Sequence, residues 1–150
     1  MIVRLRGIVY EVHEGFIILE RDGLGYEVLI GGYAAGELAA CKGQEVTLHT
    51  MEYYEGSSAA GGNLIPRLVG FLHPQDRSFF GRFITVKGMG VRKALKALAE
   101  PVGSIAAAIE NADAKYLSRL PGIGKRAADQ IIAELKGKMG DFAIGVEHIG

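Results

Sequence analysis

Apolar and polar residues alternate along the first half of the chain, which predicts β-strands. Residues 2–10 set the pattern, with Arg4 and Arg6 on one face and Leu5 on the other. Four later segments repeat the period of two: residues 16–20, 26–30, 45–51 and 64–71. Five short, mostly antiparallel strands with a break after the third predict a small Greek-key barrel of the OB type.

Two segments interrupt these strands. The connection 31–40 is rich in alanine and glycine and has room for one or two helical turns. Residues 52–63 separate the fourth and fifth predicted strands and consist largely of small residues, so we expect a long, exposed hairpin tip. Glu52 and Glu55 are the two acidic residues of this tip, and they would repel a phosphate brought near them.

After residue 72 the hydrophobic period changes from two to about 3.6, which predicts helices. His73-Pro74 begins the first of them, with Phe79, Phe80 and Phe83 on one side. Further helices are expected over residues 91–98, 104–111 with Ser104 as N-cap, 112–120 opening at Ala112 or Asp113, and 124–139. The predicted fold class is therefore α+β with two domains, a barrel over 1–72 and an all-helical domain over 73–140, followed by a tail over 141–150.

The helical half contains an internal repeat. Val86–Leu98 aligns without gaps on Leu120–Ile132, and both copies read apolar-x-Gly-apolar-Gly-x-Arg-x-Ala. Each copy follows one short helix and begins another, which is the arrangement of a helix–hairpin–helix motif. Two such motifs can pair about a pseudo-twofold axis and present their turns to the two strands of one duplex.

The repeated glycines suggest a phosphate-binding site. Two glycines around one apolar residue allow a tight turn and a close approach by a ligand, and the amides at the following helix N-terminus suit a phosphate oxygen. Basic side chains adjoin both turns. The candidate DNA-phosphate contacts are Lys87, Gly88, Gly90, Arg92, Lys93, Gly122, Gly124, Lys125 and Arg126. A plain helix start after a Pro-Gly turn is the alternative for one copy, and the second copy favours duplex binding. Contacts of this kind read phosphate and not base sequence.

The charge distribution agrees with a polyanionic partner. The chain of 150 residues has a net charge of zero, yet residues 1–72 carry −4 and residues 73–150 carry +4. Within 77–138, twelve lysines and arginines face five acidic residues, a net charge of +7. The alternative is an ordinary solvated helical surface. The charge is therefore supporting evidence for a polyanionic partner, and the repeated motif is the main evidence.

Several classes of function are disfavoured by the sequence. No apolar run approaches the ~18 residues of a membrane span and the N-terminus has no signal-peptide pattern, so we expect a cytoplasmic protein. A single cysteine and four scattered histidines predict neither a metal site nor a cofactor. The Gly124-Lys125 pair is not a nucleotide-binding P-loop, because Arg126 follows it and Arg119 stands where the first glycine belongs. Any ATPase activity must come from a partner.

The whole arrangement resembles the RuvA family of Holliday junction branch migration subunits. The likeness rests on the opening Met-Ile-x-Arg-Leu-Arg-Gly strand, the small barrel and the tandem hairpins ending in Leu-Pro-Gly-Ile-Gly-Lys-Arg-x-Ala, and it covers about residues 1–139. It implies a non-catalytic subunit that forms a homotetramer or an octamer and holds a four-way DNA junction open. It also implies a RuvB-type hexameric ATPase and a RuvC-type resolvase as partners.

The resemblance assigns roles and also has two departures. It places the family's acidic pin, which keeps the strands apart at the junction centre, at 52–63, with Glu55 as the first pin acid and Glu52 as a residue that shares the role. The second pin acid is missing, because Gly56 and Ser57 follow Glu55. The family's third domain, which binds the motor, has no counterpart in residues 141–150.

Two other functions remain as alternatives. A generic duplex-binding module of a repair complex would bind linear and four-way DNA equally. A hairpin-containing DNA glycosylase would need an amine nucleophile on the hairpin helix, where this chain has Arg126, a permanently charged guanidinium. Lys125 and Asp141 are the residues that could replace the missing groups, but no further domain remains to grip a flipped base.

Overall fold

The structure is a computed structural model that describes residues 1–56 and 61–143. It divides into two compact units, which are described separately. The barrel unit comprises residues 1–30 and 34–77, and the helical unit comprises residues 31–33 and the chain from residue 78 onward. The division falls at Arg77/Ser78, slightly beyond the boundary expected from the change in hydrophobic period.

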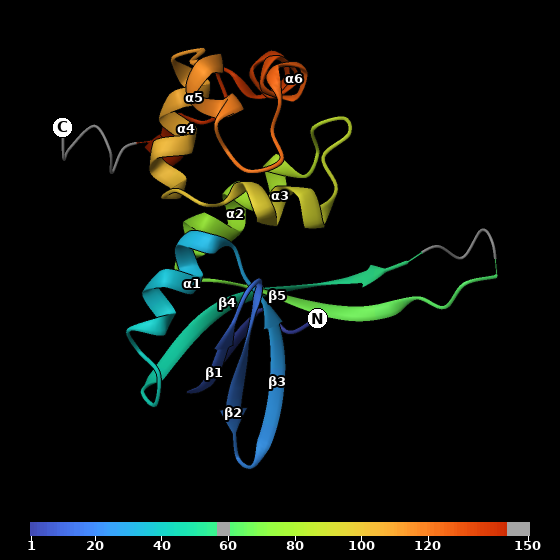
Figure 1. Cartoon of the computed structure of the whole chain (residues 1–150), viewed down its shortest axis with the longest axis vertical. Helices are drawn as coiled ribbons and strands as arrows, with labels where there is room; N and C mark the ends of the chain where they lie inside the picture. The colour runs from blue at the N-terminus through green and yellow to red at the C-terminus, as the bar shows by residue number, and fades with distance from the viewer. Residues whose placement is uncertain (57–60, 144–150) are drawn as a thin grey trace. The chain divides into compact units, whose positions relative to one another are not determined.

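The barrel unit is a closed five-stranded barrel (Figure 1). Its strands are β1 (Arg4–His13), β2 (Phe16–Arg21), β3 (Leu24–Leu29), β4 (Glu45–Glu55) and β5 (Ile65–Phe71), and helix α1 (Gly32–Ala39) connects β3 to β4. The strand order is β1-β2-β3-β5-β4, with β4 returning to β1. All neighbours are antiparallel except β3 and β5. This topology confirms the predicted OB-type barrel.

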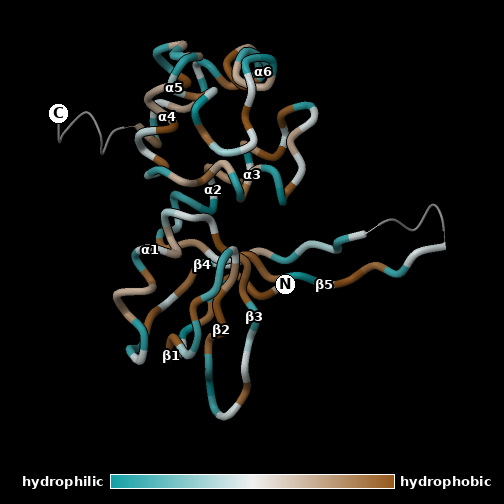
Figure 2. The backbone as a smooth tube through the Cα atoms, viewed as in Figure 1, coloured by the Kyte–Doolittle hydropathy of each residue, from teal (hydrophilic) through white to brown (hydrophobic). Residues whose placement is uncertain are grey.

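Strand alternation builds the barrel core. In β1 every second residue from Leu5 to Val9 is buried and the residues between are exposed. Gly7 stands at the middle of this inward face because a Cβ there would lie 2.6 Å from the Glu20 carbonyl oxygen. Buried aliphatic residues of β2, β3, β4 and α1, together with Ile30 just after β3, fill the interior: Ile17, Leu19, Val28, Ile30, Leu38 and Leu48. Figure 2 shows hydrophobic residues along the strands and hydrophilic ones in the turn between β2 and β3.

Strands β4 and β5 continue beyond the barrel as a two-stranded arm (Figure 1). Their pairing runs out to Glu55 opposite Ile65. The expectation that residues 52–63 form a loop was therefore wrong for 52–55, which lie in β4. Residues 57–60 of the expected tip lie outside the described residues.

The helical unit contains α3 (Val91–Ala97), α4 (Val102–Glu110), α5 (Ala114–Ser118), α6 (Lys125–Leu135) and most of α2 (Pro74–Phe83). The largest fully buried side chains of this unit are Phe79, Phe80, Phe83, Ile105, Ile109, Leu117 and Ile131. The phenylalanines predicted to share one side of α2 are therefore all buried together. No helix among the described residues is long and apolar enough to cross a membrane.

Two of the helix limits that differ from expectation have a visible structural cause. Helix α4 begins after Pro101 and not at Ser104, whose amide already donates to the Pro101 carbonyl at 3.0 Å. Helix α6 ends at Leu135 and not near residue 139, because the chain turns at Gly137 with a φ of +90°. The start at Asp113 is confirmed, since its carboxylate caps α5 by accepting from the Tyr116 amide at 3.0 Å.

The first residues of the expected tail pack on the helical unit. Residues 140–143 form a further helical turn, and Ala143 is buried. The Phe142 ring lies edge-on to Phe79, with 5.8 Å between the ring centroids. Residues 144–150 lie outside the described residues.

Candidate nucleic-acid interface

The two hairpins of the internal repeat have the same backbone conformation. Gly88 and Gly122 have φ angles of +83° and +78°, a region that non-glycine residues rarely adopt. Gly90 and Gly124 are the N-caps of α3 and α6 and are extended, with φ of −80° and −92°. Equivalent glycines of the two copies thus have the same backbone conformation and the same place in the turn. This agreement confirms the repeat predicted from the sequence.

The hydrogen bonds of the two turns also match. The Met89 amide donates to the Val86 carbonyl at 2.9 Å, and in the second copy Ile123 donates to Leu120 at 3.0 Å. In both copies the alanine of the motif donates back to the N-cap glycine at 2.9 Å. The apolar residues of both motifs are buried: Val86, Met89 and Ala94 in the first, Leu120, Ile123 and Ala128 in the second. The apolar side chains of each hairpin therefore pack into the helical unit, while its glycines stay exposed at the surface.

The fold brings the two hairpins to one groove of about 650 Å³. It is lined by Lys87, Gly88, Lys93, Gly124, Arg126, Ala127 and Gln130. Five of the nine predicted phosphate contacts are among these residues, and they come from both copies. Gly90, Arg92, Gly122 and Lys125 are the predicted contacts that do not line it. Three of the lining side chains are basic, so the groove presents positive charge beside two glycine turns.

The backbone at these glycines is open to an approaching group. A Cβ built on Gly88, Gly90 or Gly124 would meet no atom within 4 Å. At Gly122 the nearest neighbour would be the Lys96 Cδ at 3.8 Å. These four glycines are not needed to relieve crowding within the protein, so the space over them is available to a ligand.

Sequence reasoning missed some residues of this site. Gln130 and Ala127 line the groove, and Glu134 of α6 accepts a hydrogen bond from the Lys87 amide at 3.0 Å. Lys96 of α3 lies beside Gly122 of the other hairpin. Lys96 and Gln130 occupy equivalent positions in the two copies of the repeat. Extending the alignment of the copies along the helices pairs these two positions, but it does not show which residues they contact in the fold.

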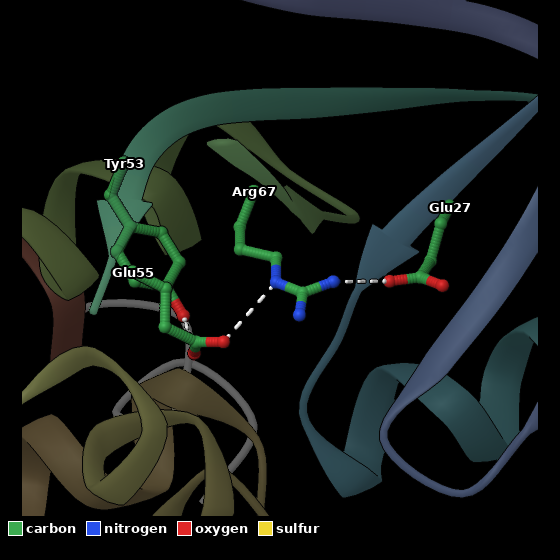
Figure 3. Close-up of polar contacts among 4 residues, drawn as sticks. All are labelled: Glu27, Tyr53, Glu55 and Arg67. Atoms are coloured by element: carbon green, nitrogen blue, oxygen red, sulfur yellow. Dashed lines mark hydrogen bonds and ion pairs between the residues drawn. The ribbon is translucent and has the colours of Figure 1, made fainter. Parts of the chain in front are cut away.

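The two acidic residues assigned to the pin are engaged in contacts within the barrel unit. Glu52 accepts a hydrogen bond from the Ile2 amide at 2.9 Å. Glu55 accepts from the Tyr53 hydroxyl at 2.6 Å and pairs with the Arg67 guanidinium at 3.2 Å (Figure 3). Arg67 also pairs with Glu27 at 3.0 Å, so one guanidinium lies between two carboxylates. The negative charge of Glu55 is therefore partly balanced by a neighbour that the sequence did not reveal.

The described residues contain no group of three or more histidine, cysteine, aspartate or glutamate side chains placed to hold a metal ion. Cys41 is a free, partly buried thiol that packs against the barrel core. The chemistry that this arrangement supports is the binding of an anion at the hairpin groove.

Each of the two units matches a known protein family. Residues 1–58 match the family described as RuvA N terminal domain, and residues 80–138 match the family described as SAM-like Helix-hairpin-helix tandem. A relative in Rhodopirellula baltica named Holliday junction branch migration complex subunit RuvA is 45% identical over 97% of this chain and 70% of its own length.

Two further relatives carry the same name. The protein from Desulfatibacillum aliphaticivorans is 43% identical over 95% of this chain and 68% of its own length, and the one from Corynebacterium glutamicum is 40% identical over 100% and 69%. The closed OB-type barrel and the tandem helix–hairpin–helix motifs together place this chain in a class of DNA-binding proteins that combine these two units. The chain belongs to the family of the Holliday junction branch migration complex subunit RuvA.

Proposed function

We propose that this protein binds four-way DNA junctions without reading their sequence, as the DNA-binding subunit of a branch migration complex. The observation that carries the proposal is the basic groove lined by both hairpins of the repeat. The relatives, by their name, act in such a complex on such a junction.

The glycine turns of the two hairpins and the cations of the groove have different chemical roles in this proposal. Gly88, Gly90, Gly122 and Gly124 let a phosphate oxygen approach the backbone amides without a side chain in the way. The cations Lys87, Lys93 and Arg126 lie in the groove and add a charge-assisted contact. Arg92 and Lys125, which neighbour Lys93 and Arg126 in the sequence, are proposed as further cations. Because amides and cations recognise phosphate alone, the binding is independent of base sequence.

The acidic residues of the β4–β5 arm supply a second element. Glu52 and Glu55 act as the pin that repels phosphates near the junction centre. Arg67 balances part of the Glu55 charge through their 3.2 Å contact, so the pin is weaker than two bare carboxylates.

The remaining parts of the proposal concern partners. The protein works as a homotetramer in the cytoplasm, so that several grooves engage the arms of one junction. It contributes no catalysis of its own, and a RuvB-type ATPase drives branch migration. A RuvC-type resolvase shares the junction with it.

Fluorescence anisotropy tests the binding proposal. A labelled four-way junction and a linear duplex of the same arm sequence are titrated with protein across a range of salt concentrations. We expect much tighter binding to the junction and a log–log salt slope of roughly −3 per chain, since three cations in the groove each contribute about −0.9. Equal affinity for both DNAs would leave only a generic duplex-binding module, and base excision from a damaged duplex would indicate a glycosylase.

The matched variants identify the groove as the binding surface. Arg126→Ala should weaken binding to every DNA and reduce the salt slope by about one. Lys42→Ala, which removes a cation of the barrel unit, should leave both quantities unchanged. An equal loss of DNA affinity in both variants would show that the groove is not the binding surface.

A further inference from the structure

The first hairpin is tied to a helix of the second motif by one carboxylate. The Lys87 amide, at the start of the turn through Gly88 to Gly90, donates to Glu134 Oε2 at 3.0 Å. The Gln130 side-chain amide donates to the same oxygen. Glu134 and Gln130 both belong to α6, the helix that the second hairpin begins. These hydrogen bonds lower the pKa of Glu134 below its ordinary value, with that from Gln130 as the largest cause, so the group is ionised at neutral pH.

This contact breaks the symmetry of the repeat. When the two copies are aligned, Lys87 corresponds to Pro121, and Glu134 corresponds to Glu100. Proline has no amide hydrogen, so the second hairpin cannot form the equivalent bond. The proline ring instead restricts the backbone at that point. The first hairpin has Lys87 at this position, so its backbone lacks the restriction that a proline ring imposes. The hydrogen bond to Glu134 holds the backbone there instead.

The position of this carboxylate is unfavourable for DNA binding by charge alone. Gln130, its hydrogen-bond partner, lines the basic groove, and Lys87 does so as well. A negative charge beside a site for phosphate reduces affinity. An exposed backbone amide does not require a carboxylate, because water can satisfy it. The feature that the carboxylate provides and water does not is a fixed distance between the first hairpin and α6.

We propose that Glu134 is a positioning residue that holds the Lys87–Gly90 turn at the separation from the second hairpin that two duplex phosphates require. The inference rests on the proposed function and refines it. Phosphates on a duplex have a set spacing, so two flexible turns would lose ordering entropy on binding that a fixed pair does not. In this proposal Glu134 makes no contact with DNA and acts through the turn that it holds.

The effect on affinity has opposite signs for the two roles Glu134 can have. If Glu134 is only a negative charge, Glu134→Ala tightens DNA binding. If it positions the hairpin, Glu134→Ala weakens binding by roughly 3- to 10-fold, the range for one lost hydrogen bond. Glu134→Gln keeps a carbonyl acceptor for the Lys87 amide without the charge and should bind at least as tightly as wild type. Asp129→Ala, which removes an exposed acid from the same helix, is the charge-matched control and should not weaken binding.

The experiment measures the four proteins on both junction and linear duplex, together with hydrogen exchange of the Lys87 amide in the free protein. We expect faster exchange and weaker binding in Glu134→Ala, with both restored in Glu134→Gln. Tighter binding of Glu134→Ala and Asp129→Ala alike would overturn the inference, as would equal losses in Glu134→Ala and Glu134→Gln. If Glu134→Ala fails to fold, weakened binding of a folded Glu134→Gln would overturn it. A wild-type protein that binds no DNA refutes the proposed function, whereas a wild type that binds only as well as Glu134→Ala refutes this inference alone.

Discussion

Placing a side chain over the second glycine turn should block DNA while the protein stays folded. Gly124 has an extended backbone with φ of −92° and ψ of −177°, a region that valine adopts readily. A Cβ at this position meets no atom within 4 Å. The Cβ of Gly124→Val therefore introduces no clash, and the branched side chain should occupy the space over the helix N-terminus where a phosphate oxygen is proposed to lie.

The expected magnitudes follow from these two facts. Valine is a poorer N-cap than glycine, which costs about 1 kcal/mol of stability and lowers the Tm of a unit of this size by about 4–8 °C. Loss of one amide–phosphate hydrogen bond costs about 1.5–3 kcal/mol of binding, an affinity loss of roughly 10- to 150-fold. The loss should affect junction and linear duplex alike, because the contact does not read junction structure. Gly90→Val should behave in the same way, since it is the equivalent N-cap.

Fluorescence anisotropy gives the affinities, and circular dichroism gives the Tm. Gly81→Val is the matched control, because Gly81 is also open and does not line the groove. The control should bind DNA like wild type. A folded Gly124→Val that binds within about twofold of wild type would refute the assignment of this turn to phosphate binding.

Three further predictions concern the pin, packing and pH. Glu55→Gln should tighten junction binding by roughly twofold, and Arg67→Gln should weaken it by a similar factor. The two substitutions change the net charge of the pin in opposite directions. Equal effects of both on the affinity measured by anisotropy would contradict the pairing. Gly31→Ala should lower stability by about 1–3 kcal/mol in urea unfolding, since its Cβ would lie 2.7 Å from a side chain at the end of α3, whereas Gly36→Ala, which meets no atom, should raise it by about 0.5–1 kcal/mol. Burial raises the pKa of Asp76 above its ordinary value, so its ionisation costs stability above that value and not below it. Asp76→Asn should therefore raise the Tm at pH 7 and leave it unchanged near pH 3; a gain of the same size at both would contradict the cause given.

The parts of the fold that follow from local pattern could be predicted from the sequence. The five strands were predicted because each alternates apolar and polar residues over a half-buried surface, as Leu5 and Val9 of β1 illustrate. The two hairpins were predicted because Gly88 and Gly122 recur with the same neighbours, and their matching positive φ angles give the physical reason.

Features that depend on distant contacts could not be predicted. Helix α6 ends early because the Glu110 carboxylate accepts from the Gly137 amide at 2.9 Å and from the Met139 amide at 2.7 Å. Nothing near Leu135 in the sequence reveals that Glu110, at the end of α4, is the partner of this turn. The same is true of Arg67, which reaches Glu27 on β3 and Glu55 on β4.

The candidate site divides in the same way. The repeat identifies its glycines and cations, but not that residues of both copies line one groove. The groove depends on where the fold of the helical unit places the two hairpins, and the spacing of the turns in the sequence does not give their separation. Glu134 could not be predicted from the sequence, because its contact is with the Lys87 amide of the other copy, 47 residues away.

The most direct test of the central claim is the response of individual backbone amides to DNA. A short duplex is titrated into ¹⁵N-labelled protein, and amide chemical shifts are followed by transverse-relaxation-optimised NMR. We predict that the largest changes fall on the amides at and just after Gly88, Gly90, Gly122 and Gly124, in both hairpins together. Saturation by DNA with these amides unmoved, and with the changes confined to the barrel unit, would contradict the account.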